Sequence, residues 1–293
     1  MMEIKKILFV TKFEELCFDA LQSLLSLRKA GLEHVVFLNV IEREKVAMRR
    51  GAGYLKGEEI RLREMANIRF IDWAENLFEL GMEVGAYIVV GSLVPEVIKA
   101  ARKEETDLIV VGRSHKGILE QLYEGSEVTE LLRRTAIPVV VFKHLTESRL
   151  VPEKLFDRLL LATDGSPASL RAVEYLKDLK GVAKKIDVVH VVDETELKGD
   201  SNLDVQKTRK EKRKKLDEIC EVFEAGGIPT KSHIRVGDPD QEIEKAAREY
   251  QSTLIVLGSS GKAAWVERWI GSTPKNIAEG SIFPTMLIPP EQA

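Results

Sequence analysis

The sequence has few of the features that point to a disulfide-stapled, zinc-binding or membrane-spanning protein. Its 293 residues include only two cysteines, Cys17 and Cys220, and these stand far apart. This excludes a disulfide framework and a four-cysteine zinc site, and it favours a reducing compartment, so we expect a cytoplasmic protein. No apolar run approaches the ~18 residues that a membrane helix needs. The run Ile7–Val10 is too short for the core of a signal peptide, so we expect no membrane association.

An excess of one charge is also lacking. The chain has 44 Lys and Arg against 47 Asp and Glu, a formal net charge of −3. A protein that coats nucleic acid or an anionic membrane normally carries an excess of positive charge. The densest basic stretch, Lys207–Lys215, places seven basic residues in nine positions and offers nucleic-acid binding as an alternative. Because acidic residues interleave with it and Leu216 begins an apolar helix face, we interpret the stretch as a solvated helix surface and do not expect nucleic acid as a partner.

A long internal repeat divides the chain in two. Residues 104–114 recur as residues 250–260, an offset of 146, and the offset is 152 where Lys6 aligns with Arg158. A repeat of this length indicates two copies of one domain. The two domains are expected at residues 1–148 and 149–293, with the boundary inside 146–155.

Within each half, short apolar runs alternate with helical patterns. Runs that are apolar on both faces suit strands of a parallel sheet covered by helices. A β-α-β-α order with right-handed crossovers gives a doubly wound sheet, whose ligand crevice lies beyond the carboxyl ends of the strands. We therefore predict an α/β protein of two tandem doubly wound domains, each with a five-stranded parallel sheet. The expected strands are Lys6–Val10, His34–Val40, Val84–Val90, Leu108–Val111 and Pro138–Phe142, then Arg158–Ala162, Ile186–Val192, Lys231–Val236, Leu254–Leu257 and Pro284–Ile288.

Two segments between these strands have the spacing of helices with one buried face. Apolar residues there recur three and four positions apart, which is typical of an amphipathic helix. The residues expected in the core are Leu216, Ile219, Cys220 and Phe223 in one segment, and Trp73, Leu77 and Leu80 in the other.

The second half carries a glycine pattern that points to phosphate binding. Gly258 and Gly261 follow the fourth expected strand, and Gly271 comes after nine further residues. Glycines at a strand end allow the backbone to approach a ligand, and Ser272 or Thr273 before a proline is typical of a helix N-cap. A helix N-terminus with available N–H groups attracts phosphate. The alternative is a tight turn followed by an ordinary helix cap.

With this pattern, both halves resemble the universal stress protein family, whose ATP-binding members carry Gly-x2-Gly-x9-Gly followed by Ser or Thr. The resemblance extends over nearly the whole chain and includes Leu159–Ser166, His190–Asp193 and Val236–Pro239. It implies an adenine nucleotide α-hydrolase-like fold and a bound ATP or AMP, with Mg²⁺ as an option beside ATP. By position, Asp164 would hydrogen-bond the adenosine part, and Ala162 and Val191 would line the base pocket. Ribose and phosphates would be held by Leu257, Gly258, Gly261, Gly271, Ser272 and Thr273, and Thr163 and Ser260 complete the nucleotide-binding set.

Two residues of this segment also have structural interpretations. Asp164 followed by Gly165 and Ser166 is typical of the N-cap of the next helix, and this role is compatible with ligand binding. His190 is flanked by valines on both sides, so we interpret it as a strand histidine that is not part of the site.

The first half departs from the pattern. Lys12 stands where the second half has Asp164, and His115 stands where it has Gly261. A lysine reverses the charge at the adenosine corner, and a side chain at position 115 can obstruct the backbone approach to phosphate. We expect this copy to have lost the complete site. The alternative is that Lys12 and His115 bind another anion.

Two functions remain open at this point. The first is a stress-response binding or regulatory module that holds the nucleotide, and the alternative is a slow ATP hydrolase or phosphoryl-transfer enzyme that uses the same pocket. Turnover would need a general base or metal carboxylates near the γ-phosphate, and the glycine loop offers only Ser259, Ser260 and Lys262. We therefore predict no catalytic residue and no dedicated metal site. The apolar last strands of the two halves are expected to pair with each other, and a homodimer of chains is a further expectation.

Overall fold

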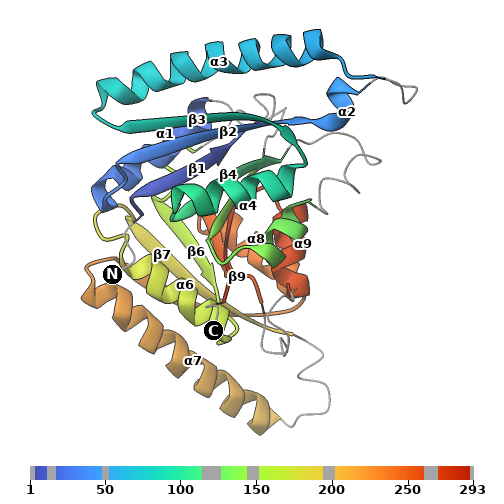
Figure 1. The fold of residues 1–293 in the computed structure, drawn as a ribbon. Helices are drawn as coiled ribbons and strands as arrows, with labels where there is room; N and C mark the ends of the chain where they lie inside the picture. Colours follow the sequence, from blue (N-terminus) through green and yellow to red (C-terminus); the bar gives the residue numbers. More distant parts are fainter. Residues whose placement is uncertain are drawn as a thin grey trace.

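The computed structural model describes residues 4–11, 18–47, 53–113, 127–143, 152–193, 202–260 and 270–290. Its strands form one continuous ten-stranded sheet in the order β3-β2-β1-β4-β5-β10-β9-β6-β7-β8 (Figure 1). The strands of the first half are β1 (Lys6–Val10), β2 (His34–Glu42), β3 (Glu83–Gly91), β4 (Leu108–Arg113) and β5 (Val139–Lys143). Those of the second half are β6 (Arg158–Ala162), β7 (Lys185–Val192), β8 (Thr230–Val236), β9 (Leu254–Gly258) and β10 (Thr285–Ile288).

Each half contributes five parallel strands, as the apolar runs predict. The α/β class and the parallel sheet are confirmed, because every pairing within a half is parallel. The halves meet at β5 and β10, which pair antiparallel with Met286 opposite Val140. Residues 139–142 of β5 and all of β10 are buried, so the two five-stranded sheets form a single sheet with its edges at β3 and β8.

Helices cover both faces of the sheet. One face carries α1 (Phe18–Leu24), the 3-10 helix η1 (Leu25–Ala30), α3 (Lys56–Glu79), α6 (Pro167–Lys177) and α7 (Asn202–Ala225). The other face carries α4 (Leu93–Glu104), a helix over residues 127–134, α8 (Pro239–Glu249) and α9 (Ser272–Gly280). The short helix α2 (Arg43–Val46) follows β2. This three-layer arrangement leaves the carboxyl ends of the strands as the place where loops can form a site.

Side chains also join the halves outside the sheet. Arg171 of α6 donates to the carbonyl of Ala136 in the first half at 3.3 Å. Thr129 Oγ1 donates to the carboxylate of Glu279 in α9 at 2.8 Å. These contacts place α6 and α9, the two helices that begin near the predicted nucleotide site, against the first half.

The expected core stripes are correct with one exception. Leu216, Cys220 and Phe223 are buried in α7, and Ile219 packs against the same cluster. In α3, Leu77 is buried and Trp73 packs edge-on against Phe9 and Phe37 at 6.0 and 5.6 Å. Leu80 is exposed, because α3 ends at Glu79 and Leu80 is its C-cap.

The described part of the basic stretch has the features of a solvated helix surface. Arg213 pairs with Asp217 at 3.4 Å and Lys214 with Glu218 at 4.0 Å, both one turn apart in α7. Such pairs are typical of exposed helix faces. Among the helices in the described ranges, none combines the length and apolar character needed to cross a membrane.

Candidate functional site

The carboxyl ends of three neighbouring strands bring the predicted adenosine-binding residues together. In the parallel pairing of β6 with β9 and β7, Ala162 lies opposite Leu257 on one side and Val189 on the other. Ala162, Leu257 and the half-buried Val191 all pack on the sheet face that α8 and α9 cover. The structure therefore places three apolar side chains around one strand end, directly before Thr163 and Asp164.

The turn after β6 is held by hydrogen bonds to the backbone of Thr163. Thr163 N donates to Val189 O at 2.9 Å, and His190 Nδ1 donates to Thr163 O at 2.7 Å. His190 thus has the structural role that its strand position predicts, and it also positions the turn. Gly165 has φ of +76°, a left-handed conformation that favours glycine. Asp164 Oδ1 accepts from Ser166 N at 2.9 Å.

The N-cap of α6 is Ser166, and the interpretation of Asp164 as the cap is wrong. Ser166 Oγ accepts from Ser169 N at 3.3 Å, three residues into the helix. Pro167 occupies the first helical position, where a missing N–H costs nothing. Asp164 lies two residues too early for capping, so its carboxylate remains at the strand end.

Gly258 is required for packing within the protein. A Cβ at this position would lie 2.5 Å from Ser169 N and 2.6 Å from the carbonyl carbon of Ala168. The expectation that this glycine serves ligand approach is therefore incomplete, because the first turn of α6 already occupies the space. A glycine here lets α6 sit directly on the end of β9.

Two hydrogen bonds connect the segments of the glycine motif that are described. Ser166 Oγ donates to Ser260 O at 3.1 Å, and Gly271 N donates to Ser259 O at 3.1 Å. Ser259 and Ser260 are both buried. The turn after β6, the end of β9 and the start of α9 therefore meet at one place, although they are far apart in the sequence.

The start of α9 differs from the sequence-based expectation. Gly271 is the N-cap, a residue without a side chain that could cap the helix. Ser272 and Thr273 are the first two helical residues, so neither is the cap. Because glycine has no side-chain oxygen, it leaves the first-turn N–H groups to other acceptors.

A carboxylate that the sequence analysis missed lies beside the start of α9. Asp240, in the first turn of α8, accepts from Asn276 Nδ2 at 2.6 Å. Burial raises the pKa of Asp240, while hydrogen bonds from Asn276 and Thr273 oppose this shift. The sequence offers no signal for this contact, because an acidic residue at a helix start is common for helix-dipole reasons alone.

Several predicted residues lie outside the described ranges. Gly261 of the nucleotide-binding set and Lys262 are among them. So are Lys12 and His115, the positions that distinguish the first half from the second. The expected loss of the first-half site therefore stays a prediction.

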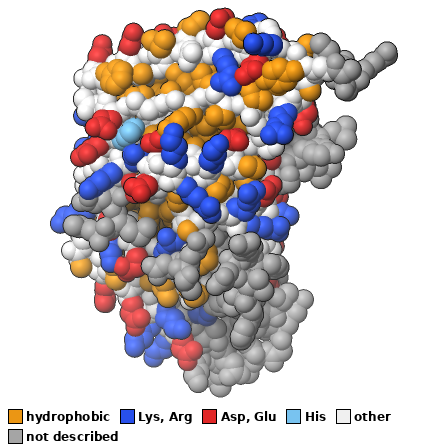
Figure 2. Space-filling model, in the orientation of Figure 1, with side chains coloured by type: hydrophobic (Ala, Val, Ile, Leu, Met, Phe, Trp, Pro, Cys, Tyr) orange, Lys and Arg blue, Asp and Glu red, His pale blue; other side chains and the backbone are white. Residues whose placement is uncertain are grey.

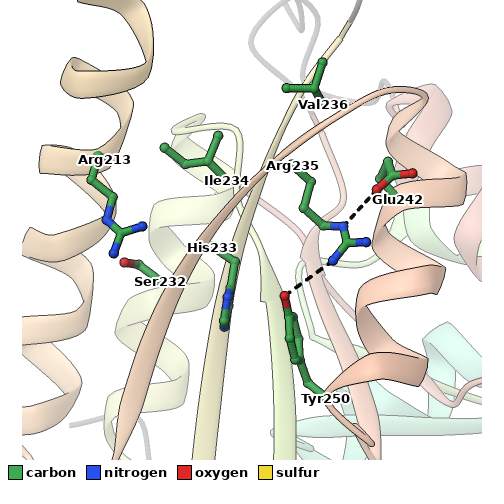
Figure 3. Close-up of a pocket in the computed structure, with 8 residues that line it drawn as sticks. All are labelled: Arg213, Ser232, His233, Ile234, Arg235, Val236, Glu242 and Tyr250. Carbon is green, nitrogen blue, oxygen red and sulfur yellow. Dashed lines mark hydrogen bonds and ion pairs between the residues drawn. The ribbon is translucent and has the colours of Figure 1, made fainter. Parts of the chain in front are cut away.

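A second polar site lies at the free edge of the sheet, away from the glycine motif. It is a groove of about 400 Å³ along β8, between α7 and α8 (Figure 3). Its lining residues are Arg213, Ser232, His233, Ile234, Arg235, Val236, Glu242 and Tyr250.

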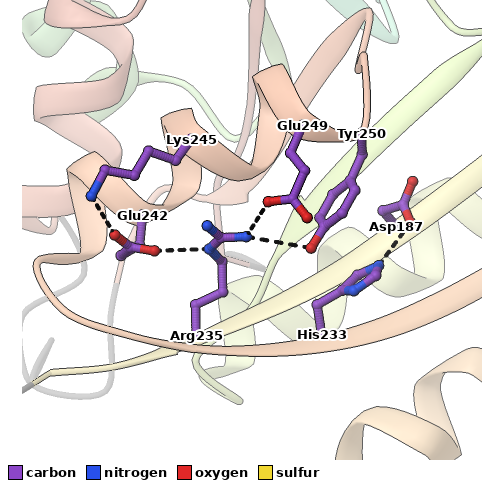
Figure 4. A network of polar contacts seen from close by, with 7 residues as sticks. All are labelled: Asp187, His233, Arg235, Glu242, Lys245, Glu249 and Tyr250. Atoms are coloured by element: carbon purple, nitrogen blue, oxygen red, sulfur yellow. Dashed lines mark hydrogen bonds and ion pairs between the residues drawn. The ribbon is translucent and has the colours of Figure 1, made fainter.

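The charged groups of this groove are largely paired with one another (Figure 4). Arg235 contacts the carboxylates of Glu242 and Glu249, each at 2.8 Å, and these contacts raise the pKa of Arg235. His233 contacts the buried carboxylate of Asp187 at 2.8 Å and stacks on Tyr250 at 4.1 Å. The network joins the edge strand β8 to α8 and β7, so its role is to stabilise the edge of the sheet. In the part of the chain that is described, no group of three His, Cys, Asp or Glu side chains is placed to hold a metal ion.

Comparison with known proteins agrees with the repeat and the fold. The universal stress protein family matches residues 3–143 and again residues 155–289. The crystal structure of a universal stress protein from Archaeoglobus fulgidus DSM 4304 is similar with a TM-score of 0.73 at 25% identity, over 99% of this chain and 98% of that one. The universal stress protein MJ0577 of Methanocaldococcus jannaschii is 27% identical over 154 residues, 46% of this chain and 95% of that protein. Universal stress protein Rv2005c of Mycobacterium tuberculosis is 23% identical over 211 residues, 70% of this chain and 69% of that protein. The chain therefore belongs to the universal stress protein family, as a tandem of two family domains.

Proposed function

We propose that the second half binds one adenine nucleotide, ATP or AMP, and acts as a regulatory binding module in the stress response. One observation carries the proposal. The end of β6, the end of β9 and the start of α9 converge, joined by the hydrogen bonds of Ser166 to Ser260 and of Gly271 to Ser259. Carboxyl ends of parallel strands are where doubly wound sheets bind ligands.

The residues at this place suit the two ends of a nucleotide. Ala162, Val191 and Leu257 offer apolar surface for a flat base, and Asp164 offers an acceptor for adenosine hydroxyl or amino groups. At the other end, the N-cap of α9 is Gly271, which has no side-chain oxygen for the first turn, and a helix N-terminus favours a phosphate group. The proposal assigns the base to the strand ends and the phosphates to α9.

The competing function, ATP hydrolysis, has one feature in its favour. Asp240 is a half-buried carboxylate beside the start of α9, with a raised pKa. However, it already accepts hydrogen bonds from Asn276 and Thr273, which orient it within the protein. A general base must instead reach the attacking water. We therefore propose slow or absent turnover, and a rate near the ~10 per second typical of enzymes, lost in Asp240→Asn, would favour the hydrolase.

Calorimetric titration of nucleotide-free protein tests the binding proposal. ATP and AMP should each bind at one site per chain, while GTP and inorganic triphosphate should bind much more weakly because the base pocket contributes. Asp164→Ala should weaken binding, and Asp157→Ala supplies a matched control, since Asp157 precedes the opposite end of β6 and pairs with Lys184. Wild-type protein that gives no binding heat with ATP or AMP at about 1 mM would overturn the proposal.

A further inference from the structure

Helix α3 of the first half exposes a stripe of apolar side chains. Eight of the twelve exposed large apolar residues in the described ranges fall within residues 54–80. Four of them form the stripe, because Ile60, Ile68, Ile71 and Phe78 lie within about 80° of arc on one helix face. Their exposed fractions are between 47 and 62%. The buried Phe70 and Leu77 lie on the other side, so the stripe is additional to the core face of α3.

The second half supplies an internal comparison. α7 has the same length as α3, 24 residues, and the same place in the repeat, and the two helices lie at opposite ends of the molecule (Figure 1). Among residues 210–225 of α7, Val222 is the one large apolar side chain that is exposed. Figure 2 shows apolar side chains gathered over the upper part of the molecule, where α3 and β3 lie. Since the two helices cover their sheets in the same way, the fold itself does not require the stripe.

The stripe is nearly symmetric about the middle of α3. Ile60 and Phe78 lie 18 residues apart, and Ile68 and Ile71 lie on either side of the midpoint between them. A two-fold axis near residues 69 and 70 therefore places Ile60 of one copy beside Phe78 of another, with the two central isoleucines in contact. Twofold symmetry of this kind is the usual basis of homodimers.

We propose that α3 is a homodimer face, on which α3 of a second copy of this chain packs antiparallel. The flanking charges fit the same arrangement, because Arg61 and Glu79 are also 18 residues apart and would meet across the axis at both ends. Arg61 is exposed and already bound to Glu58, so Glu79 of the second copy would extend an existing ion pair. The proposal does not depend on nucleotide binding.

One contact across the axis is unfavourable, and it provides a sharp test. Glu64 and Glu75 lie within the stripe, and the twofold axis brings Glu64 of one copy close to Glu75 of the other. A stripe with two carboxylates is a poor match for an anionic lipid surface, which binds helices with basic flanks. In the dimer, Glu64 of each copy lies near Glu75 of the other, which makes two repulsive contacts. Glu75→Lys would turn both into attractive contacts, so we predict that it strengthens association.

The size of the stripe indicates a weak dimer. A helix of 24 residues is about 36 Å long, and a strip about 12 Å wide offers roughly 400 Å² per copy. This is about half of the ~800 Å² per partner in a standard stable interface. We therefore expect a dissociation constant on the order of 10–100 µM.

Sedimentation velocity of the full chain, from about 5 to about 500 µM, tests the proposal. Wild type should shift from monomer to dimer across this range. Glu75→Lys should lower the dissociation constant roughly tenfold, and the double variant Ile68→Gln with Ile71→Gln should raise it at least tenfold. Glu221→Lys and Val222→Gln make the same chemical changes on the exposed face of α7 and should leave association at the wild-type level. Circular dichroism checks that each variant is folded.

Two results would overturn the proposal. Wild type that stays monomeric at about 500 µM would show that a second copy does not occupy the stripe. A dimer whose dissociation constant is the same in Glu75→Lys and in the double isoleucine variant would place the interface elsewhere on the molecule.

Discussion

Replacement of Gly258 by alanine tests whether the first glycine of the motif is a packing residue. The new Cβ would lie 2.5 Å from Ser169 N, 2.6 Å from the carbonyl carbon of Ala168 and 2.8 Å from its Cβ. Two of these three contacts are with backbone, so relief requires α6 to move away from β9. Overpacking of this kind typically costs about 1–3 kcal/mol, and a backbone clash belongs at the upper end. We therefore expect a loss of about 3 kcal/mol in the free energy of unfolding, without any nucleotide present.

Thermal unfolding followed by circular dichroism measures this loss. For a unit of about 150 residues, 1 kcal/mol shifts the Tm by roughly 2–4 °C, so the second half should melt about 6–12 °C lower. Gly280→Ala is the matched control, because a Cβ at the end of α9 meets nothing within 4 Å. That variant should be neutral or slightly stabilising, since alanine favours a helix over glycine. If Gly258→Ala melted within about 1 °C of wild type, the packing explanation would be wrong, and ligand approach would again be the better reason for this glycine.

Two other substitutions follow from the surroundings of the site. Ser166→Ala removes the cap of α6 and the donor to the carbonyl of Ser260, so the Tm should fall by roughly 4–8 °C for a loss of about 2 kcal/mol. Ser92→Ala is the control, because Ser92 is an N-cap whose side chain makes no capping bond, and it should change the Tm by less than about 2 °C. If Ser166→Ala and Ser92→Ala lowered the Tm equally, this reasoning would be wrong. Asp240→Asn should raise the Tm at pH 7, because burial raises the pKa of Asp240 and makes its ionised form costly in the folded state. This gain in Tm should disappear as the pH falls through the raised pKa towards ~4, the ordinary value for Asp, because Asp240 is then protonated and uncharged. If the gain persisted at low pH, the charge of Asp240 would not be its cause.

The sequence predicts the sheet well because its strands are long apolar runs. Runs such as Leu254–Leu257 are buried on both faces, and this pattern has few other structural solutions. The apolar last strands are also visible in the sequence, but the antiparallel register of Met286 against Val140 depends on tertiary geometry. Periodicity likewise places Leu77 in the core but cannot say that α3 ends before Leu80.

The site itself is predicted only in outline. Position in the repeat locates Asp164 and Gly258 at the strand ends, and both lie there. The reason for Gly258 is a contact with α6, and the cap of that helix is Ser166 in place of Asp164. These details depend on how a helix approaches a strand end, which a one-dimensional pattern does not contain. Asp240 was missed for the same reason, because its partner Asn276 lies 36 residues away on another helix.

The central claim is that one nucleotide binds per chain, in the second half. Its most direct test is calorimetric titration of nucleotide-free protein with ATP, using wild type, Asp164→Ala and Gly261→His. The last variant introduces the residue that the first half has at the matching position, His115, and Gly261 lies outside the described ranges. We predict a stoichiometry of one, an affinity loss in Asp164→Ala of about 0.5–3 kcal/mol, and a larger loss in Gly261→His. A stoichiometry of two that Gly261→His leaves unchanged, or an affinity that Asp164→Ala does not alter, would contradict the account.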